Sequence, residues 1–155
     1  MAATRHPVPI LMGLLALGAC GDDPIGPEMA RVSDPAVQAF VEEVNAYRGT
    51  VGCEPLTWRS DVAAVAQGHS EDMVARDYFD HRTPEGLSPF DRLHEAGISF
   101  SRAAENIAYG YPTASAVLAG WLGSPGHKAN LDNCALTDHG VGLEGTHWTH
   151  LFVTP

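Results

Sequence analysis

The C-terminal segment HWTHLFVT, residues 147–154, is apolar on both faces of the strand that it predicts. Because successive side chains of a strand point to opposite faces, Leu151 and Val153 lie on one face and Trp148 and Phe152 on the other. A strand that is apolar on both sides fits a central sheet with helices above and below it. The segment therefore predicts an α/β fold with three layers, α/β/α.

Other segments of the chain can build these layers. Four helices are predicted from N-cap residues, from a proline in the first turn, or from apolar side chains at helical spacing. Their predicted starts are Asp34, Ser60, Ser88 and Thr113. Further strands are predicted at residues 104–109 and about 139–144.

An apolar run near the N-terminus, VPILMGLLALGAC, begins shortly after Arg5 and ends at Cys20. It is about a dozen residues long, whereas a membrane-spanning helix needs roughly 20, so residues 1–19 are predicted to be a secretory signal peptide. The end of the run, LGAC, resembles the lipobox of bacterial lipoproteins, in which the cysteine is lipidated and becomes the first residue of the mature chain. We therefore predict lipidation of Cys20; an ordinary signal peptide cut nearby is the alternative.

The rest of the chain, after this leader, is characterised by its composition and charge. Residues 20–33 carry proline, glycine and acidic residues and are predicted to be a lipidated tether. Residues 34–155 are predicted to form one domain, because 45% of the chain is hydrophobic and 18% charged, as in an ordinary compact fold. The formal net charge is −10, and it becomes −11 when residues 1–19, which contain Arg5 and no acidic residue, are removed. Such an acidic surface repels phosphate backbones, which argues against nucleic acid as a partner.

Two cysteines remain after Cys20 is assigned to a lipid. An even pair in an exported chain predicts a disulfide between Cys53 and Cys134. Closing a loop of this length would stabilise the fold by about 4 kcal/mol in the chain-entropy model. The competing interpretation is a catalytic Cys134 with His139 five residues further on.

Four motifs in order resemble the CAP superfamily, which comprises cysteine-rich secretory proteins, antigen 5 and pathogenesis-related 1 proteins, in its bacterial secreted branch. The motifs are AVAQGHSEDMVARDYFDHRTPEG, AENIAYGY, AGWLGSPGHKANL and GTHWTHLFV. The resemblance covers roughly residues 36–154. It implies a three-layer α/β/α sandwich of the CAP (SCP) type, with a small, mainly antiparallel central sheet and a large cleft.

The resemblance also implies the residues of the cleft. In animal and plant members, two histidines and two glutamates line its floor and can hold a divalent cation. Here the matching residues are His81 of YFDH, Glu105 of AEN and His147 of THWTH. The position of the second glutamate is occupied by Ser124, and His127 of SPGH is the candidate to fill the same space.

Imidazole nitrogens with one carboxylate suit zinc, and three protein ligands leave an open coordination position. We therefore expect a divalent cation, zinc first, on His81, Glu105 and His147, with His127 as a candidate fourth ligand. These residues stand 20 to 24 positions apart, so only the assumed fold brings them together. Without metal, the same residues would form a hydrogen-bonded network in which Glu105 accepts from an imidazole and favours its protonated form.

Nearby polar residues are predicted to have structural roles. His69 points inward from the second helix, and His150 shares an apolar strand face with aromatic residues. Asn106 lies on the opposite face of its strand from Glu105 and is expected to tie a loop through its amide. Ser124 is expected to cap the short helix that contains His127.

Common hydrolase signatures are missing from the sequence. There is no G-x-S-x-G motif, and HEAGI has Ile98 where a zincin needs its second histidine. The predicted function is that of an exported, lipid-anchored protein of the bacterial cell envelope that binds a divalent cation or an extended ligand in the cleft. A lipid, a peptide and a glycan remain open as that ligand. The alternatives are a metal-assisted hydrolase in which Glu105 activates bound water, and a structural or adhesion module.

Overall fold

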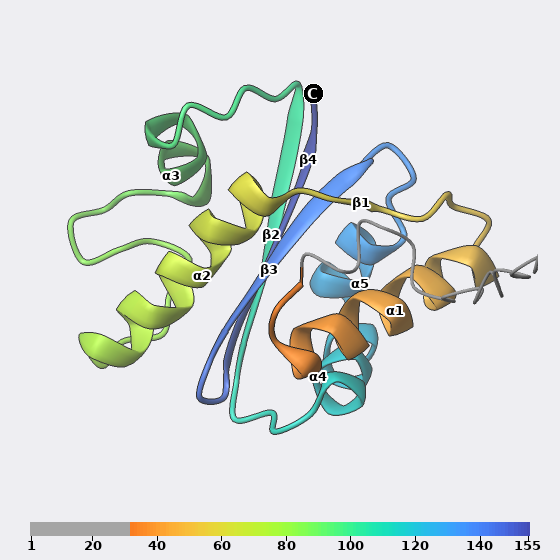
Figure 1. Ribbon diagram of the computed structural model, residues 1–155, viewed down its shortest axis with the longest axis horizontal. Helices are drawn as coiled ribbons and strands as arrows, with labels where there is room; N and C mark the ends of the chain where they lie inside the picture. Colours follow the sequence, from red (N-terminus) through yellow and green to blue (C-terminus); the bar gives the residue numbers. More distant parts are fainter. Residues whose placement is uncertain (1–31) are drawn as a thin grey trace, which may run out of the picture.

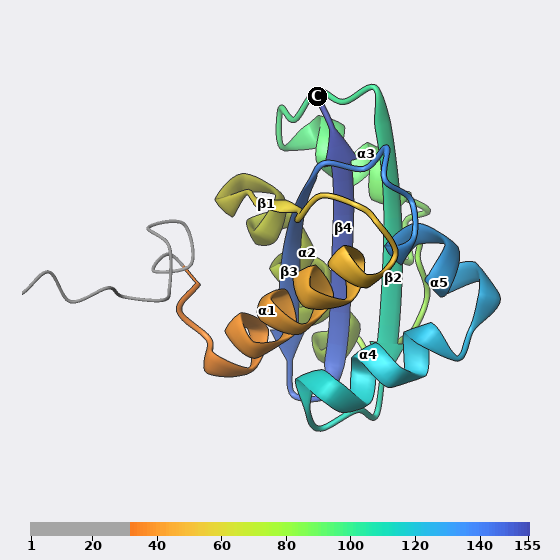
Figure 2. The same cartoon turned by 90° about the vertical axis from the view of Figure 1, so that its right-hand side faces the viewer.

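A four-stranded sheet lies between two groups of helices in the computed structural model (Figures 1 and 2). The structure describes residues 32–155, so the predicted signal peptide, the Cys20 lipidation and nearly all of the predicted tether lie outside the described residues. One face of the sheet is covered by α1 (Pro35–Thr50), α4 (Ala114–Leu122) and α5 (Pro125–Leu131), and the other by α2 (Ser60–Ala75) and α3 (Pro89–Glu95). The predicted α/β/α sandwich is confirmed. Within the described part of the chain, no helix combines the length and the hydropathy needed to cross a membrane.

The sheet is mixed but mainly antiparallel. Its strands are β1 (Thr57–Trp58), β2 (Arg102–Tyr109), β3 (Asp138–Glu144) and β4 (His147–Thr154), in the order β1-β3-β4-β2. Only β1 and β3 are parallel. The three longer strands lie where the sequence predicts them, to within two residues. The short β1 was not predicted, because two residues show no alternation.

The central strand β4 is buried on both faces, as its sequence predicts. Leu151 and Val153 belong to the apolar cluster beneath α2 and α3, whereas Trp148 and Phe152 belong to the larger cluster beneath α1 and α4. The two faces of one strand therefore serve two separate parts of the core.

Helix α2 lies directly on β3 because two glycines allow it. A Cβ added at Gly140 would lie 2.1 Å from the backbone nitrogen of Ala63, and one added at Gly142 would lie 2.3 Å from that of Gln67. Both distances are far below van der Waals contact. The position of α2 therefore requires glycine, which has no side chain, at these two positions of β3.

A buried cation and a disulfide join the end of α1 to the segment that precedes β3. Arg48 is 1% exposed, and its guanidinium donates to four backbone carbonyls, those of Glu54, Leu131, Asn133 and Leu136. The predicted disulfide between Cys53 and Cys134 is confirmed. It removes Cys134 from the free thiols, so the alternative of a catalytic Cys134 with His139 is wrong.

Two neutral histidines lie inside the core on the α1 side of the sheet. His139 and His150 are fully buried, and Nδ1 of the first lies 3.0 Å from Nε2 of the second. The ring of His150 packs on Phe152 with centroids 3.8 Å apart, so its predicted packing role is confirmed. Burial lowers the pKa of both histidines, that of His139 to about 3, and the positive charge of Arg48 adds to the effect. Both rings are therefore neutral, and one donates to the other.

Replacing Gly142 by alanine should push α2 away from β3, because the new Cβ meets the helix backbone and cannot turn aside. We expect a loss of about 1–3 kcal/mol in the free energy of unfolding, measured by urea denaturation. Gly126→Ala is the matched control, since a Cβ there meets nothing within 4 Å. Equal stabilities of the two variants would contradict the close approach of α2.

The buried histidine pair should make stability depend on pH. The folded pKa values of His139 and His150 lie below the unfolded value of about 6.5, so the unfolded chain binds more protons as the pH falls below that value. Their contribution is complete above pH 7 and is lost toward acid, with a slope of up to about 1.4 kcal/mol per pH unit for each histidine. Urea denaturation between pH 7.5 and pH 5 measures this slope.

In a His150→Gln variant, the slope of unfolding free energy against pH should decrease by the contribution of about one proton. His94→Gln, at an exposed position, should leave the slope unchanged. His81 acts in the opposite direction, because its folded pKa is raised and its contribution is lost as pH rises. That contribution is common to all the variants and cancels in the comparison. Identical slopes for the wild type and His150→Gln would refute the assignment.

Candidate functional site

The site prediction centres on Glu105, which lies on the outer strand β2. β2 is an outer strand of the sheet, and two side chains close its edge. Trp121 Nε1 donates to the carbonyl of Ile107 at 3.1 Å, and Asn130 Nδ2 lies 3.5 Å from the carbonyl of Glu105. These two outward carbonyls therefore already accept hydrogen bonds from side chains, so they are not available as acceptors for another strand.

Glu105 is buried at this edge and is held by two cationic side chains. Its side chain is 2% exposed. Oε1 lies 2.8 Å from Nδ1 of His81, and Oε2 forms an ion pair with Arg92. Arg92 also donates to the backbone carbonyl of His81 at 2.8 Å, which fixes the loop that carries this histidine. Arg92 was not predicted from the sequence.

This network sets the charge of His81. The hydrogen bond to Glu105 raises the pKa of His81, and partial burial and the charge of Arg92 oppose that rise. The side chain of His81 is 48% exposed, so an imidazolium stabilised by Glu105 can meet a ligand from solvent. Glu105 thus accepts from an imidazole and favours its protonated form, as the sequence analysis expects for these residues without a metal ion.

A hollow of about 310 Å³ lies beside this network, and we call it the aromatic hollow. It is lined by Phe79, Ile107, Ala108, Tyr109, Tyr111, Gly120, Trp121, Ser124 and His127. Nδ1 of His127 is buried without a hydrogen-bond partner among the described residues. Burial lowers the pKa of His127, and the charge of nearby His81 lowers it further. His127 is thus a neutral imidazole close to His81.

The predicted capping role of Ser124 is wrong in its chemistry. Ser124 occupies the N-cap position of α5, with a proline after it, but its side chain makes no capping hydrogen bond. Ser124 is instead one of the residues that line the aromatic hollow.

His147 lies apart from Glu105 on the same face of the sheet. The strand register pairs His147 with Tyr109 and Glu105 with Leu151, a separation of four residues, or about 13 Å at ~3.3 Å per residue. The ring of His147 packs on Tyr109 with centroids 4.5 Å apart, and Phe79 lies close to both rings. His147 therefore belongs with the aromatic side chains.

These positions do not form a ready metal site. In residues 32–155, no three His, Cys, Asp or Glu side chains are grouped so that they could hold a metal ion. Both oxygens of Glu105 already have partners, and His147 lies four residues along the sheet from Glu105, packed on Tyr109. The zinc site therefore stays a prediction, and we derive no chemistry through it.

Two of the structural roles predicted from the sequence are confirmed beside the site. His69 is buried, and its Nε2 lies 3.0 Å from the carbonyl of Asp80, so it supports the loop next to His81. Asn106 donates to the carbonyl of His127 at 3.2 Å and accepts from Asn130 at 2.8 Å. Its amide thereby ties α5 to β2.

The aromatic lining was not predicted as a group. The sequence does show Phe79 just before His81 and two tyrosines, Tyr109 and Tyr111, just after the β2 core. Aromatic residues at the ends of segments that carry predicted ligands are the signal that could have indicated the hollow.

Comparison of the sequence with known proteins finds one family and two curated relatives. The model of the cysteine-rich secretory protein family matches residues 41–153. The uncharacterized protein YkwD of Bacillus subtilis is 40% identical over 115 residues, which cover 73% of this chain and 45% of YkwD. The uncharacterized membrane protein YlbC of the same species is 37% identical over 123 residues, 79% of this chain and 36% of YlbC. The chain thus spans less than half the length of these curated relatives.

Solved structures show the same architecture. An extracellular protein of Bacillus anthracis that contains an SCP domain superposes with a TM-score of 0.77 at 35% identity, over 82% of this chain and 43% of that one. An outer surface protein of Borrelia burgdorferi gives a TM-score of 0.73 at 23% identity, over 79% of this chain and 95% of that one. The second likeness supports the fold alone.

The Glu105 network predicts opposite changes in the pKa of His81 for two substitutions. Glu105→Gln removes the charge that raises this pKa, so the pKa should fall, whereas Arg92→Met removes an opposing positive charge, so the pKa should rise. Titration of the His81 ring proton by NMR measures both. Glu95→Gln, at an exposed position on α3, is the control and should leave the titration unchanged. Shifts of the same sign in the two variants would disprove the network.

Proposed function

This chain belongs to the cysteine-rich secretory protein family, and on that premise we propose that it is an exported binding module that holds a glycan of the cell envelope in the aromatic hollow. The observation that carries the proposal is the exposure of aromatic rings around this hollow. Phe79 is 49% exposed and Tyr109 is 61% exposed. Large rings left in water at the mouth of a concave site are typical of a ligand-binding surface.

The chemistry of the lining suits a sugar. The flat C–H faces of a pyranose ring pack on aromatic rings, and the hollow offers such rings on several sides. Sugar hydroxyls need a few hydrogen-bonding groups in fixed positions. Nδ1–H of His81 donates to Glu105, and in the imidazolium form that this bond favours, Nε2–H of His81 is free to donate as well. Ser124 offers a hydroxyl that makes no capping hydrogen bond.

Other ligands fit these contacts less well. A peptide could add to β2 only if its outward carbonyls were free, and Trp121 and Asn130 occupy them. The hollow is open and small for an acyl chain, and the acidic chain repels anionic lipid headgroups. A divalent cation would have to displace the partners of Glu105.

The envelope location rests on the leader and on the relatives. The apolar run that ends at Cys20 supports export and lipid anchoring. A relative with 35% identity is an extracellular protein, and YlbC is a membrane protein. A glycan of the cell wall is within reach of a domain held at that surface.

A second candidate function is hydrolysis of the bound glycan, and the opposite pKa shifts of His81 and His127 favour it. The environment of His81 raises its pKa and that of His127 lowers its pKa, the directions that suit a general acid and a general base. In this function His81 would protonate the leaving oxygen and His127 would take a proton from water. Shortened products, absent with His127→Gln although binding persists, would support it.

Binding of tetra-N-acetylchitotetraose, measured by isothermal titration calorimetry, tests the main proposal. Phe79→Ala and Tyr109→Ala should each weaken binding by roughly two- to twelvefold, because each removes one stacking surface of about 0.5–1.5 kcal/mol. Phe90→Ala is the matched control, since Phe90 is 44% exposed but lies on α3 outside the hollow.

The metal question is answered in the same experiment. Binding should survive EDTA, because no step of the proposal uses a metal ion. Binding that EDTA abolishes and zinc restores would favour the predicted metal site instead. No binding by the wild type, or equal losses in all three alanine variants, would reject the glycan proposal.

A further inference from the structure

One contact, between Tyr111 and Gly120, builds the wall of the aromatic hollow on the side of α4. Both residues line the hollow, and neither is fully buried. A Cβ added at Gly120 would lie 2.6 Å from Oη of Tyr111 and 2.7 Å from its Cζ, so the tyrosine ring lies directly on the backbone of the helix. Both distances are far below van der Waals contact. The ring can therefore keep this position only while residue 120 has no side chain.

Both partners of this contact are held in place. The carbonyl of Tyr111 accepts from Nε1 of Trp148 at 2.9 Å, which fixes the backbone of the tyrosine. The helix is fixed by the residue after Gly120, because Trp121 is 2% exposed and donates from Nε1 to the carbonyl of Ile107. A side chain at position 120 would therefore move the tyrosine ring rather than the helix. The open space beside that ring is the hollow.

The closed end of the hollow is apolar. The lining residues Ile107, Ala108 and Trp121 are almost fully buried and mark this end, whereas the exposed rings of Phe79 and Tyr109 mark the mouth. Nε1 of Trp121 is already bonded, so the side chains at the closed end present carbon atoms to a ligand. A methyl group fits there, whereas a sugar hydroxyl would lose its hydrogen bonds to water without replacement.

Hydroxyl groups accompany this apolar end. Tyr111 and Ser124 line the hollow, and each carries a hydroxyl, which can donate to a carbonyl or accept from an N–H. An acetamido group is a methyl joined to an amide with one donor and one acceptor. It therefore matches both the carbon-lined end and the hydroxyl-bearing residues of the hollow.

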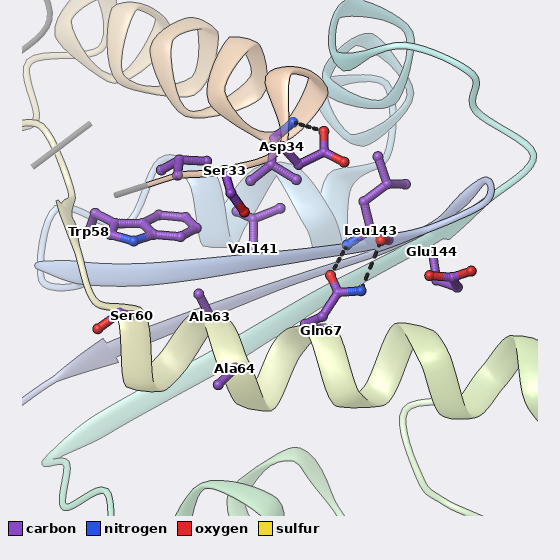
Figure 3. A pocket seen from close by; sticks show the side chains of 12 residues that line it. Ser33, Asp34, Trp58, Ser60, Ala63, Ala64, Gln67, Val141, Leu143 and Glu144 are labelled. Atoms are coloured by element: carbon purple, nitrogen blue, oxygen red, sulfur yellow. Dashed lines mark hydrogen bonds between the residues drawn. The ribbon is translucent and has the colours of Figure 1, made fainter. Parts of the chain in front are cut away.

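The larger groove at the opposite edge of the sheet lacks these features. Figure 3 shows this groove, of about 440 Å³, between the start of α1 and the side of α2. Among the described residues that line it, Trp58 is the one aromatic residue, and it is buried. The side-chain amide of Gln67 already bonds both backbone groups of Leu143, at 2.9 and 3.1 Å. A sugar is therefore assigned to the aromatic hollow and not to this groove.

We propose that the aromatic hollow selects sugars that carry an N-acetyl group, and that Gly120 determines this selectivity. The inference rests on the proposed function, glycan binding in the hollow. Gly120 lets the ring of Tyr111 lie back on α4, and the acetamido methyl occupies the space that this leaves beside Trp121. A side chain at position 120 brings the tyrosine ring into that space and excludes the acetamido group, while the rings at the mouth still stack on the sugar.

The test compares two uncharged oligosaccharides by isothermal titration calorimetry on the purified protein. Tetra-N-acetylchitotetraose carries acetamido groups, and cellotetraose has the same length and linkage with hydroxyls in their place. Because neither is charged, the acidic net charge of the protein favours neither. The wild type should bind cellotetraose more weakly by roughly tenfold or more.

Three variants locate the selectivity. Gly120→Ala should weaken binding of the acetylated oligosaccharide by roughly tenfold or more and leave cellotetraose binding nearly unchanged. Adding Tyr111→Ala to this variant removes the displaced ring and should restore part of the lost affinity. Gly68→Ala is the matched control, since Gly68 lies inside α2, away from the hollow, and a Cβ there meets nothing within 4 Å. It should bind like the wild type.

The outcomes separate this inference from the proposed function. Equal affinity of the wild type for the two oligosaccharides would overturn the inference and leave glycan binding intact. Unchanged affinity in Gly120→Ala, or a loss that Tyr111→Ala does not relieve, would overturn the role of Gly120. If neither oligosaccharide binds, the proposed function fails and the inference fails with it. The comparison on the wild type remains decisive for the selectivity if Gly120→Ala does not fold.

Discussion

The site depends on the neutralisation of one buried carboxylate. Glu105 lies on an outer strand, almost out of contact with water, where an unpaired charge would cost several kcal/mol. Arg92 from α3 and His81 from the loop after α2 supply the opposite charge and the hydrogen bonds. Since Arg92 also binds the backbone of His81, this one ion pair places the loop, and with it Phe79, over the edge of β2.

The sequence predicts the layers of this fold better than its site. The two-sided apolar pattern of β4 and the helix start at Asp34 are local signals, and both are confirmed. Arg92 illustrates the limit. A buried carboxylate requires a cation, but the spacing of charged residues does not say which arginine meets Glu105 in space. The bond between His139 and His150 escaped prediction for the same reason, because each residue lies on a different strand.

The two outer edges of the sheet are protected to different degrees. At β2, side chains of Trp121 and Asn130 reach the outward carbonyls, and the resulting wall is concave and aromatic. At β3, Arg59 and Gln67 hydrogen-bond to the outward backbone groups of the residues on either side of Val141, and Val141 itself is buried. An edge strand is normally a liability for aggregation. In this molecule one edge borders a hollow lined by aromatic side chains, and the other is closed by Arg59, by Gln67 and by the burial of Val141.

The four backbone carbonyls that bind the guanidinium of Arg48 have a consequence for the role of the disulfide. Arg48 and the disulfide fasten the same two segments, one after α1 and one before β3. These hydrogen bonds need no oxidant, so they can hold the same segments together when the two cysteines are reduced. The disulfide therefore reinforces a junction that the hydrogen bonds of Arg48 already hold.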